Sequence, residues 1–266
     1  MGTPFKVKKL RFDKRNNINS GIGRRIKGLS LSKNGRVIGY RNPNGKVSDI
    51  AVLPTIRHSA IRNGEIENIT KECYKENIRV IENSATILFV VDSSGSMGVE
   101  YQMVKVKSLI YSLLIDAYQK RDRVGMISFR ASVAKLLLPF TNSFYIAKKK
   151  LEKLETGGKT PLAHGLKLAF QLFKQEKQKN PSGYSIMVLV SDGRGNVPLD
   201  GKNSLDQSEV YGLYIKKLGV KTLVLDTETD HLAFGYSWEL ARLMNGQYMK
   251  LDNLNAENVN DIIFSL

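Results

Sequence analysis

The chain has 266 residues, of which 42% are hydrophobic and 25% are charged, and its formal net charge is +16. This length predicts one large domain, or one domain with an extension. The sequence has no run of about 18 apolar residues that would predict a membrane-spanning helix, and its first residues lack the apolar run of a secretory signal. The one cysteine, Cys73, excludes an internal disulfide and predicts a reducing, cytoplasmic location.

The positive charge is concentrated in the first third of the chain. Residues 1–83 contain 18 Lys and Arg against 7 Asp and Glu, a net charge of +11, and residues 84–266 contain 23 against 18, a net charge of +5. This excess predicts an anionic partner, which is an acidic protein surface, a polycarboxylate ligand or nucleic acid. The alternative is a solvated surface rich in Lys and Asn. No aromatic-interleaved nucleic-acid motif accompanies this charge.

Two segments precede the main domain. Residues 1–35 are basic and rich in Gly, Asn and Ser, and we expect a disordered arm there. We expect residues 36–83 to be a linker segment that packs on the main domain. Its predicted features are a strand at 36–40, a turn at 42–45, packed apolar residues at 50–61 and an edge strand at 77–81.

From residue 84 onward, predicted strands alternate with predicted helices. The strands are Thr86–Val91, Arg123–Phe129, Ala134–Pro139, Ser185–Val190, Lys221–Asp226 and Gln247–Leu251. The helices are Gln102–Gln119, Ser143–Leu154, Pro161–Gln175, Leu205–Lys217, Tyr236–Leu243 and Ala256–Phe264. Several strands are continuously apolar, which predicts a doubly wound, mostly parallel α/β domain over residues 84–266. We expect residues 132–139 to form a hairpin with 123–129 at the edge of the sheet.

The first of these strands ends in a motif of oxygen-bearing side chains. Asp92, Ser94 and Ser96 occupy alternate positions directly after the apolar run 87–91, and Gly95 allows a tight turn among them. Carboxylate and hydroxyl oxygens suit Mg²⁺ and Mn²⁺. Ligands in open α/β sheets bind at the carboxyl ends of strands, so the motif predicts a cation site there.

Two later segments point to the same edge of the sheet. Residues 156–162 form a glycine turn that leads into a helix, with Thr160 at the N-cap and Pro161 at the first helical position. Asp192 follows a second buried strand at 188–190 and precedes Gly193. We therefore expect two aspartates and one threonine to meet above this edge.

Asp92, Ser94, Ser96, Thr160 and Asp192 match the pattern Asp-x-Ser-x-Ser, distant Thr, distant Asp without a gap. This pattern resembles the metal-ion-dependent adhesion site of the von Willebrand factor A family. The resemblance implies a Rossmann-like fold with one Mg²⁺ or Mn²⁺ at the carboxyl edge of its sheet. It also implies that the metal keeps one position open for a carboxylate of a partner protein.

The flanking sequence resembles the C-terminal part of the magnesium chelatase D protein, over about residues 24–200. The matching segments are 47–51, 55–57, 113–125, 136–139, 156–162 and 191–196. The resemblance implies an accessory subunit that docks beside an AAA+ ATPase subunit and a large subunit that inserts a metal into a tetrapyrrole. The bound Mg²⁺ would be adhesive and would not be the ion inserted. Basic residues in 24–62 would steer an acidic surface of a partner.

The sequence does not predict ATP binding or catalysis by this chain. A Walker A motif ending at Gly158-Lys159-Thr160 would need glycine where Lys153 stands, and a helix is predicted before it instead of a strand. No set of nucleophile, base and orienting residue has usable spacing. The sequence contains neither the AAA+-like domain nor the acidic, proline-rich linker of the chelatase D protein. We therefore expect a non-catalytic subunit, with the AAA+ part on a separate protein or absent.

Two basic residues lie next to the predicted metal ligands. Arg194 and Lys159 are candidates to contact a partner's carboxylate, and the alternative for both is a solvated loop side chain. Two other functions stay open. The chain is either a von Willebrand A partner of another AAA+ ATPase in metalloenzyme maturation, or a nucleic-acid-binding protein whose basic arm loses affinity steeply with salt.

Overall fold

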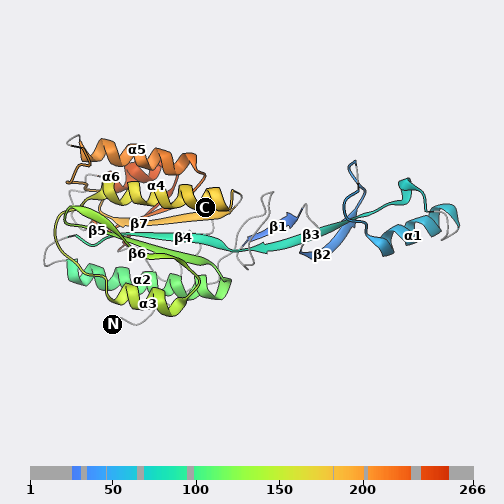
Figure 1. Ribbon diagram of the computed structural model, residues 1–266, viewed down its shortest axis with the longest axis horizontal. Helices are drawn as coiled ribbons and strands as arrows, with labels where there is room; N and C mark the ends of the chain where they lie inside the picture. The colour runs from blue at the N-terminus through green and yellow to red at the C-terminus, as the bar shows by residue number, and fades with distance from the viewer. Residues whose placement is uncertain are drawn as a thin grey trace.

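The computed structural model describes residues 26–251, except 31–34, 46, 65–68, 95–98, 182, 201–202 and 229–234. The described chain has two parts, which are an α/β domain that begins at Ala85 and an extension that projects from it (Figure 1). The arm predicted over residues 1–35 lies mostly outside the described residues, and so does the helix predicted at 256–264. No helix in the described ranges is long and apolar enough to cross a membrane.

The α/β domain is built on a six-stranded sheet with the order β6-β5-β4-β7-β8-β9. The strands pair in parallel except β6, which pairs antiparallel with β5 at the sheet edge. This confirms the predicted hairpin and the mostly parallel sheet. The strands are β4 Ala85–Asp92, β5 Arg123–Arg130, β6 Val133–Thr141, β7 Tyr184–Ser191, β8 Lys221–Asp226 and β9 Gln247–Lys250.

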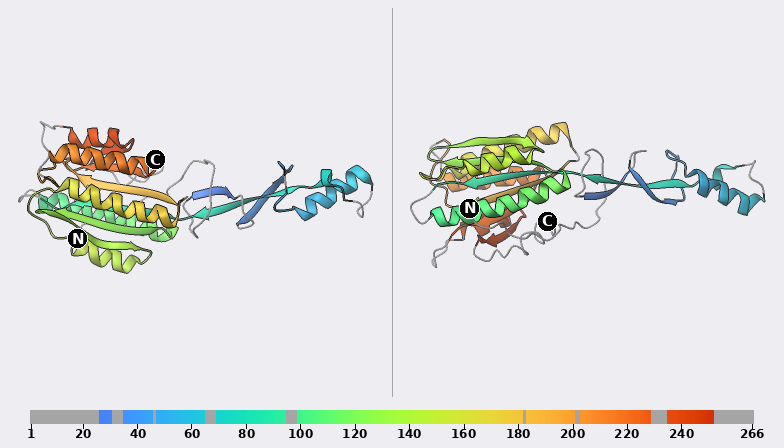
Figure 2. Two further views of the ribbon diagram at one scale, coloured as in Figure 1. Left: turned by 45° about the horizontal axis from the view of Figure 1, so that its top comes forward. Right: turned by 90° about the horizontal axis from the view of Figure 1, so that it is seen from below.

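Helices cover both faces of this sheet (Figure 2). Helices α2 and α3 pack on one face, and α4, α5 and α6 pack on the other. The arrangement confirms the doubly wound fold. The helices are α2 Val99–Lys120, α3 Phe144–Glu152, α4 Leu162–Lys179, α5 Ser204–Lys217 and α6 Tyr236–Leu243.

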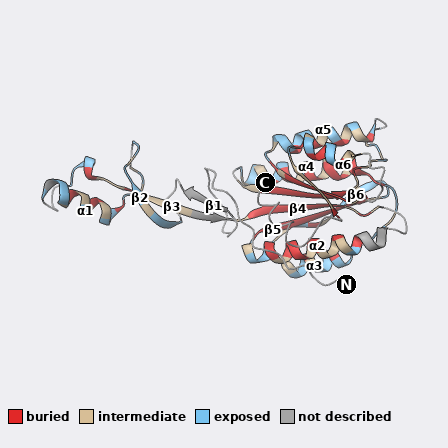
Figure 3. Cartoon of the chain, turned by 180° about the vertical axis from the view of Figure 1, so that it is seen from behind, coloured by how far each residue is buried: buried red, intermediate tan, exposed pale blue. Residues whose placement is uncertain are grey.

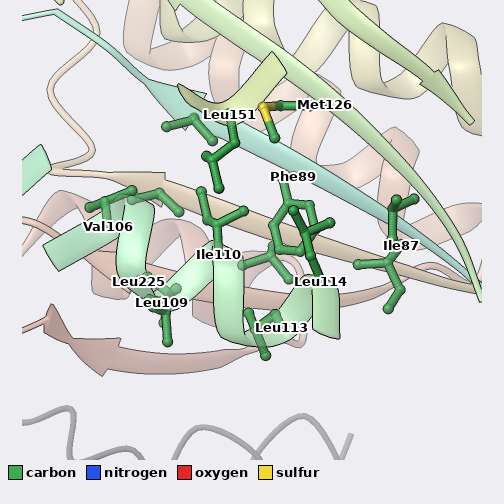
Figure 4. Packing of buried hydrophobic residues seen from close by; sticks show 14 of the residues in the cluster. Ile87, Phe89, Val106, Leu109, Ile110, Leu113, Leu114, Met126, Leu151 and Leu225 are labelled. Carbon is green, nitrogen blue, oxygen red and sulfur yellow. The ribbon is translucent and has the colours of Figure 1, made fainter. Parts of the chain in front are cut away.

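The central position of β4 in the sheet explains why its sequence is continuously apolar. Phe89 and its alternate neighbours belong to the hydrophobic cluster under α2, where Ile110 and Leu114 also lie (Figure 4). Leu88 and Val90 belong to the opposite cluster, under α4. A strand that is buried on both faces needs apolar side chains at every position, and Figure 3 shows the buried residues gathered along these strands.

The extension contains a three-stranded antiparallel sheet, a helix and a short 3₁₀ helix. Its elements are β1 Ile26–Ser30, β2 Arg36–Arg41, α1 Val52–Asn63, η1 Lys71–Cys73 and β3 Glu76–Asn83. Strand β3 lies between β1 and β2 and continues through Ser84 into β4. We predicted an edge strand here, and that was wrong because β3 pairs on both sides. We also expected residues 36–83 to pack on the main domain, but they run outward from it (Figure 1).

Polar contacts hold the extension together where it has little apolar core. Asp49 accepts hydrogen bonds from Arg79 Nε at 2.5 Å and from Asn77 at 3.1 Å. Glu76 accepts from Arg41 at 2.9 Å and from the Ser48 hydroxyl at 3.2 Å. The side chains of β2 are almost all exposed, so these ion pairs take over a role that apolar burial has in the main domain.

Candidate metal centre

The candidate site lies where two neighbouring parallel strands end. β4 and β7 pair in register, with Val91 opposite Val190. The loops that follow these strands therefore begin at the same edge of the sheet. This register brings Asp92 beside Ser191, and the charge of Asp192, which follows Ser191, acts on the Asp92 carboxylate.

Asp92 is the centre of a hydrogen-bond network. Its Oδ1 accepts from the Ser94 backbone N–H at 2.9 Å and from the Ser94 hydroxyl at 2.6 Å. Its Oδ2 accepts from the Ser191 hydroxyl at 3.1 Å. Burial raises the pKa of Asp92 to about 6, the hydrogen bonds from Ser94 oppose the rise, and the negative charge of Asp192 adds to it.

Thr160 comes to this network from a distant part of the chain. Its hydroxyl lies 2.6 Å from the Ser94 hydroxyl. Its backbone N–H donates to Asn196 Oδ1 at 2.8 Å, and its carbonyl accepts from the Asn196 N–H at 3.1 Å. Because Asn196 holds the Thr160 backbone in the loop, α4 starts at Leu162 and Pro161 is its N-cap. The prediction that Pro161 is the first helical residue was wrong by one position.

Asp192 is held by a different set of contacts. Its Oδ1 accepts from the Arg194 backbone N–H at 2.9 Å, and Arg194 Nε lies 4.0 Å from its Oδ2. Arg194 also forms an ion pair with the buried carboxylate of Glu228. Burial raises the pKa of Asp192, and the contacts with Arg194 oppose that rise. Arg194 therefore balances two carboxylates of its own chain.

Within the described residues, the hydrogen-bond network includes neither of the remaining predicted residues, Ser96 and Lys159. Ser96 lies in the segment 95–98, outside the described residues. Lys159 is exposed on the loop that carries Thr160. That loop is fastened to the first motif, because the Gly157 N–H donates to the Ser93 carbonyl at 2.7 Å. Gly157 has a φ of +117°, which favours glycine at this position.

Three contacts of the site were not predicted from the sequence. Ser191, Asn196 and Glu228 contact Asp92, Thr160 and Arg194, respectively. Ser191 directly precedes Asp192, so its position at the end of the predicted strand could have identified it as part of the site. Glu228 follows β8 by two positions, and nothing local in the sequence connects it to Arg194.

The donor set suits a hard divalent cation. Asp92 and Asp192 would supply carboxylates, and Ser94 and Thr160, whose hydroxyls lie in one network with Asp92, would supply hydroxyls. No Lys or Arg in the described ranges forms an ion pair with Asp92. Within those ranges, no group of three or more His, Cys, Asp and Glu side chains is arranged so that it could hold a metal ion. An oxygen-only site with few carboxylates fits Mg²⁺ or Mn²⁺ and does not suit zinc.

The α/β domain is similar to domains of known sequence and structure. A family model of the von Willebrand factor type A domain matches residues 87–194. The solved von Willebrand domain of the type V pili tip protein Mfa5 from Porphyromonas gingivalis has a TM-score of 0.52 at 12% identity. The match covers 66% of this chain and 94% of that one. This likeness shows the fold alone.

Two relatives match different lengths of the chain. The magnesium-chelatase 67 kDa subunit of Chlorobaculum parvum is 32% identical over 254 residues, and the match covers 86% of this chain and 40% of that subunit. The protein MJ0910 of Methanocaldococcus jannaschii is 38% identical over 174 residues, and the match covers 64% of this chain and 98% of MJ0910. The chain therefore spans less than half the length of the chelatase subunit.

Proposed function

Because the chain belongs to the von Willebrand factor type A family and is related to magnesium-chelatase subunits, we propose that it is an accessory, docking subunit of an ATP-dependent metal chelatase. The observation that supports this role is the network that joins Asp92, Ser94 and Thr160 at the carboxyl edge of the sheet. Such a network offers carboxylate and hydroxyl oxygens as ligands at the carboxyl edge of the sheet.

Asp92, Ser94, Ser96, Thr160 and Asp192 would hold Mg²⁺ or Mn²⁺. When bound, the cation supplies a positive charge that attracts a carboxylate of a partner protein. The protein's own contribution is to hold its carboxylates and hydroxyls in place before the partner arrives, which lowers the free energy cost of ordering them on binding.

The partners proposed are an AAA+ ATPase subunit and the large subunit of a tetrapyrrole chelatase. The match to the 67 kDa subunit supports a chelatase complex, and the sequence offers no Walker A motif of its own. Lys159 is exposed at the rim and is the first candidate to contact an incoming carboxylate. Arg194 would have to leave Glu228 to make the same contact.

Affinity capture with purified subunits tests this proposal. The full chain would be immobilised and challenged with the AAA+ subunit and the large chelatase subunit, in Mg²⁺ and in EDTA. We expect at least one subunit to bind in Mg²⁺, to be released by EDTA, and to bind weakly to Thr160→Ala. Asn203→Ala, at the exposed N-cap of α5, is the control. Binding of neither subunit, or binding that ignores EDTA and Thr160→Ala, would contradict the docking role.

A further inference from the structure

Helix α1 of the extension buries small and polar side chains and exposes large apolar ones. The buried residues of this region are small or polar, and they are the N-cap Ala51 with Thr55 and Ser59 of the helix. The Thr55 hydroxyl accepts a hydrogen bond from the Lys75 N–H at 3.0 Å. A surface helix normally buries its large apolar residues, so the face of α1 that carries them needs another explanation.

Three large apolar residues of α1 are exposed, whereas Ile56 is half-buried. Leu53 and Ile61 are each 80% exposed, and Val52 is 61% exposed. Leu53, Arg57 and Ile61 are spaced at i, i+4 and i+8, so they form one stripe opposite the buried stripe. This stripe is about 12 Å long. Single exposed apolar residues are common on soluble proteins, but Leu53 and Ile61 of the stripe and the neighbouring Val52 are exposed together on one short helix, which is typical of an interaction site.

The position of α1 separates it from the candidate metal centre. β3 and β4 form a nearly continuous strand path from Glu76 to Asp92, with α1 beyond its outer end and the metal ligands at its inner end (Figure 1). These 17 residues, counted from the sequence, span roughly 50 Å when extended. The outer face of α1 and the candidate metal centre are therefore two separate surfaces.

The positive charge of Arg57 restricts which partner can bind the stripe. Arg57 is exposed, stands midway between Leu53 and Ile61, and has no ion pair within the described residues. In a pair of α1 helices packed stripe to stripe, Arg57 would face the Arg57 of a second copy, and like charges in contact are unfavourable. Residues 1–25 carry 8 Lys and Arg against one Asp, so they do not complement Arg57 either.

We propose that α1 is a second docking element, which enters an apolar groove that carries a carboxylate on a partner protein. Leu53 and Ile61 fill the groove, and Arg57 pairs with the carboxylate between them. This partner is a different protein from the one bound at the metal centre. The proposal rests on the proposed function only in its choice of probes, which are the AAA+ subunit and the large chelatase subunit. It makes the chain a spacer that holds two proteins at opposite ends.

Binding of the two purified subunits to full-chain variants tests the proposal. The variants are Leu53→Asp with Ile61→Asp, and separately Arg57→Glu. The matched controls on α3 are Tyr145→Asp, at a residue 72% exposed, and Lys149→Glu, at an exposed lysine. We expect both α1 variants to bind one subunit at least roughly tenfold more weakly, in EDTA as well as in Mg²⁺. We expect the controls to bind like the wild type. Equal melting temperatures establish that the exposed substitutions leave the fold intact.

The possible results separate the two proposals. If both subunits bind the α1 variants with the affinity they have for the wild type, the α1 proposal is wrong. This holds even if EDTA releases one subunit, because that result bears only on the metal centre. If the α1 variants lose a subunit that EDTA does not affect, the α1 proposal holds whether or not metal-dependent docking does. The proposal would also be overturned if the wild type is a dimer and the variant Leu53→Asp with Ile61→Asp is a monomer, because a second copy would then be the occupant. The proposal would be overturned as well if deletion of residues 252–266 removes protection of the α1 amides from hydrogen exchange, because that segment of the same chain would then cover α1.

Discussion

At the scale of single residues, Asp92 is the group on which the candidate site depends. Its carboxylate accepts hydrogen bonds from hydroxyl and N–H donors, and the like charge of Asp192 acts on it. Burial keeps the pKa of Asp92 near 6 while no cation is bound. The arrangement destabilises the ionised metal-free protein, and a bound cation would remove that effect.

Asp92→Asn is expected to stabilise the metal-free protein at neutral pH. The pKa of Asp92 rises from 3.8 to about 6 on folding, so its contribution to stability is present below about pH 4 and is lost as the pH rises through 6. The amide cannot ionise, and the variant should be more stable than the wild type by about 3 kcal/mol in EDTA at pH 7.5. The difference should shrink towards pH 4.5. Urea unfolding at both pH values measures it.

An exposed aspartate serves as the control for this experiment. Asp200 is exposed in the loop before α5, and Asp200→Asn should leave the free energy of unfolding nearly unchanged at both pH values. The role given to Asp92 is wrong if Asp92→Asn is less stable than the wild type in EDTA at pH 7.5.

At the scale of elements, the packing of α4 on the sheet positions the loop that carries Thr160. Gly165 lies in the first turns of α4, and a Cβ atom there would come within 2.7 Å of the Phe129 ring. Phe129 is completely buried on β5, so the ring cannot move aside without disturbing its neighbours. Helix and strand approach closely because the residue at this contact is glycine.

Gly165→Ala should therefore destabilise the protein by about 2 kcal/mol, because it overpacks a buried contact. Gly212→Ala is the matched control on α5, where a Cβ would meet the side chains of Met244, Leu240 and Leu243 at 3.1–3.3 Å. Those flexible side chains can adjust, and alanine favours the helix by up to about 1 kcal/mol. The two variants are compared by urea unfolding. Equal losses of stability would contradict this explanation of the α4 contact.

The elements of the α/β domain were predictable because their signals are local. The run before Asp92 is apolar at every position, and the short sequence between β5 and β6 leaves room only for a hairpin. The extension was not predictable in the same way. We expected Leu53 and Ile61 to pack on a neighbouring element, whereas the structure exposes both. Apolar residues at helical spacing do not reveal whether their own chain or another protein covers them.

The candidate site was predicted as a set of ligands but not as a network. Asp92, Ser94 and Thr160 follow a recognisable pattern, and the structure brings them together. The ion pair between Arg194 and Glu228 joins residues 34 positions apart, and it depends on how β7 and β8 pair. Such contacts follow from the tertiary structure, so no short motif predicts them.

At the scale of the whole molecule, the core belongs entirely to one of the two parts. Both hydrophobic clusters consist of residues from Ala85 onward. The Ala85 N–H donates to Asp122 Oδ1 at 2.7 Å, which anchors the start of β4 inside the domain. The match to MJ0910 covers 64% of the chain and 98% of that protein. The extension therefore adds a second surface to a domain that is complete in its core.

A chain that begins at Ser84 is expected to fold without the extension. Its melting temperature should lie within about 4 °C of the full chain's, which corresponds to about 1 kcal/mol in a domain of this size. Calorimetry and circular dichroism of the two chains measure the difference. An insoluble or molten product would show that the extension contributes to the core after all.

The candidate metal centre is tested most directly by a Mn²⁺ titration of the full chain, followed by electron paramagnetic resonance. We expect one saturable Mn²⁺ site per chain that Mg²⁺ displaces. Binding should be at least roughly tenfold weaker in Asp192→Asn and unchanged in Lys159→Ala, which alters an exposed residue of the neighbouring loop. No saturable site in the wild type, or equal affinity in Asp192→Asn, would contradict the metal centre.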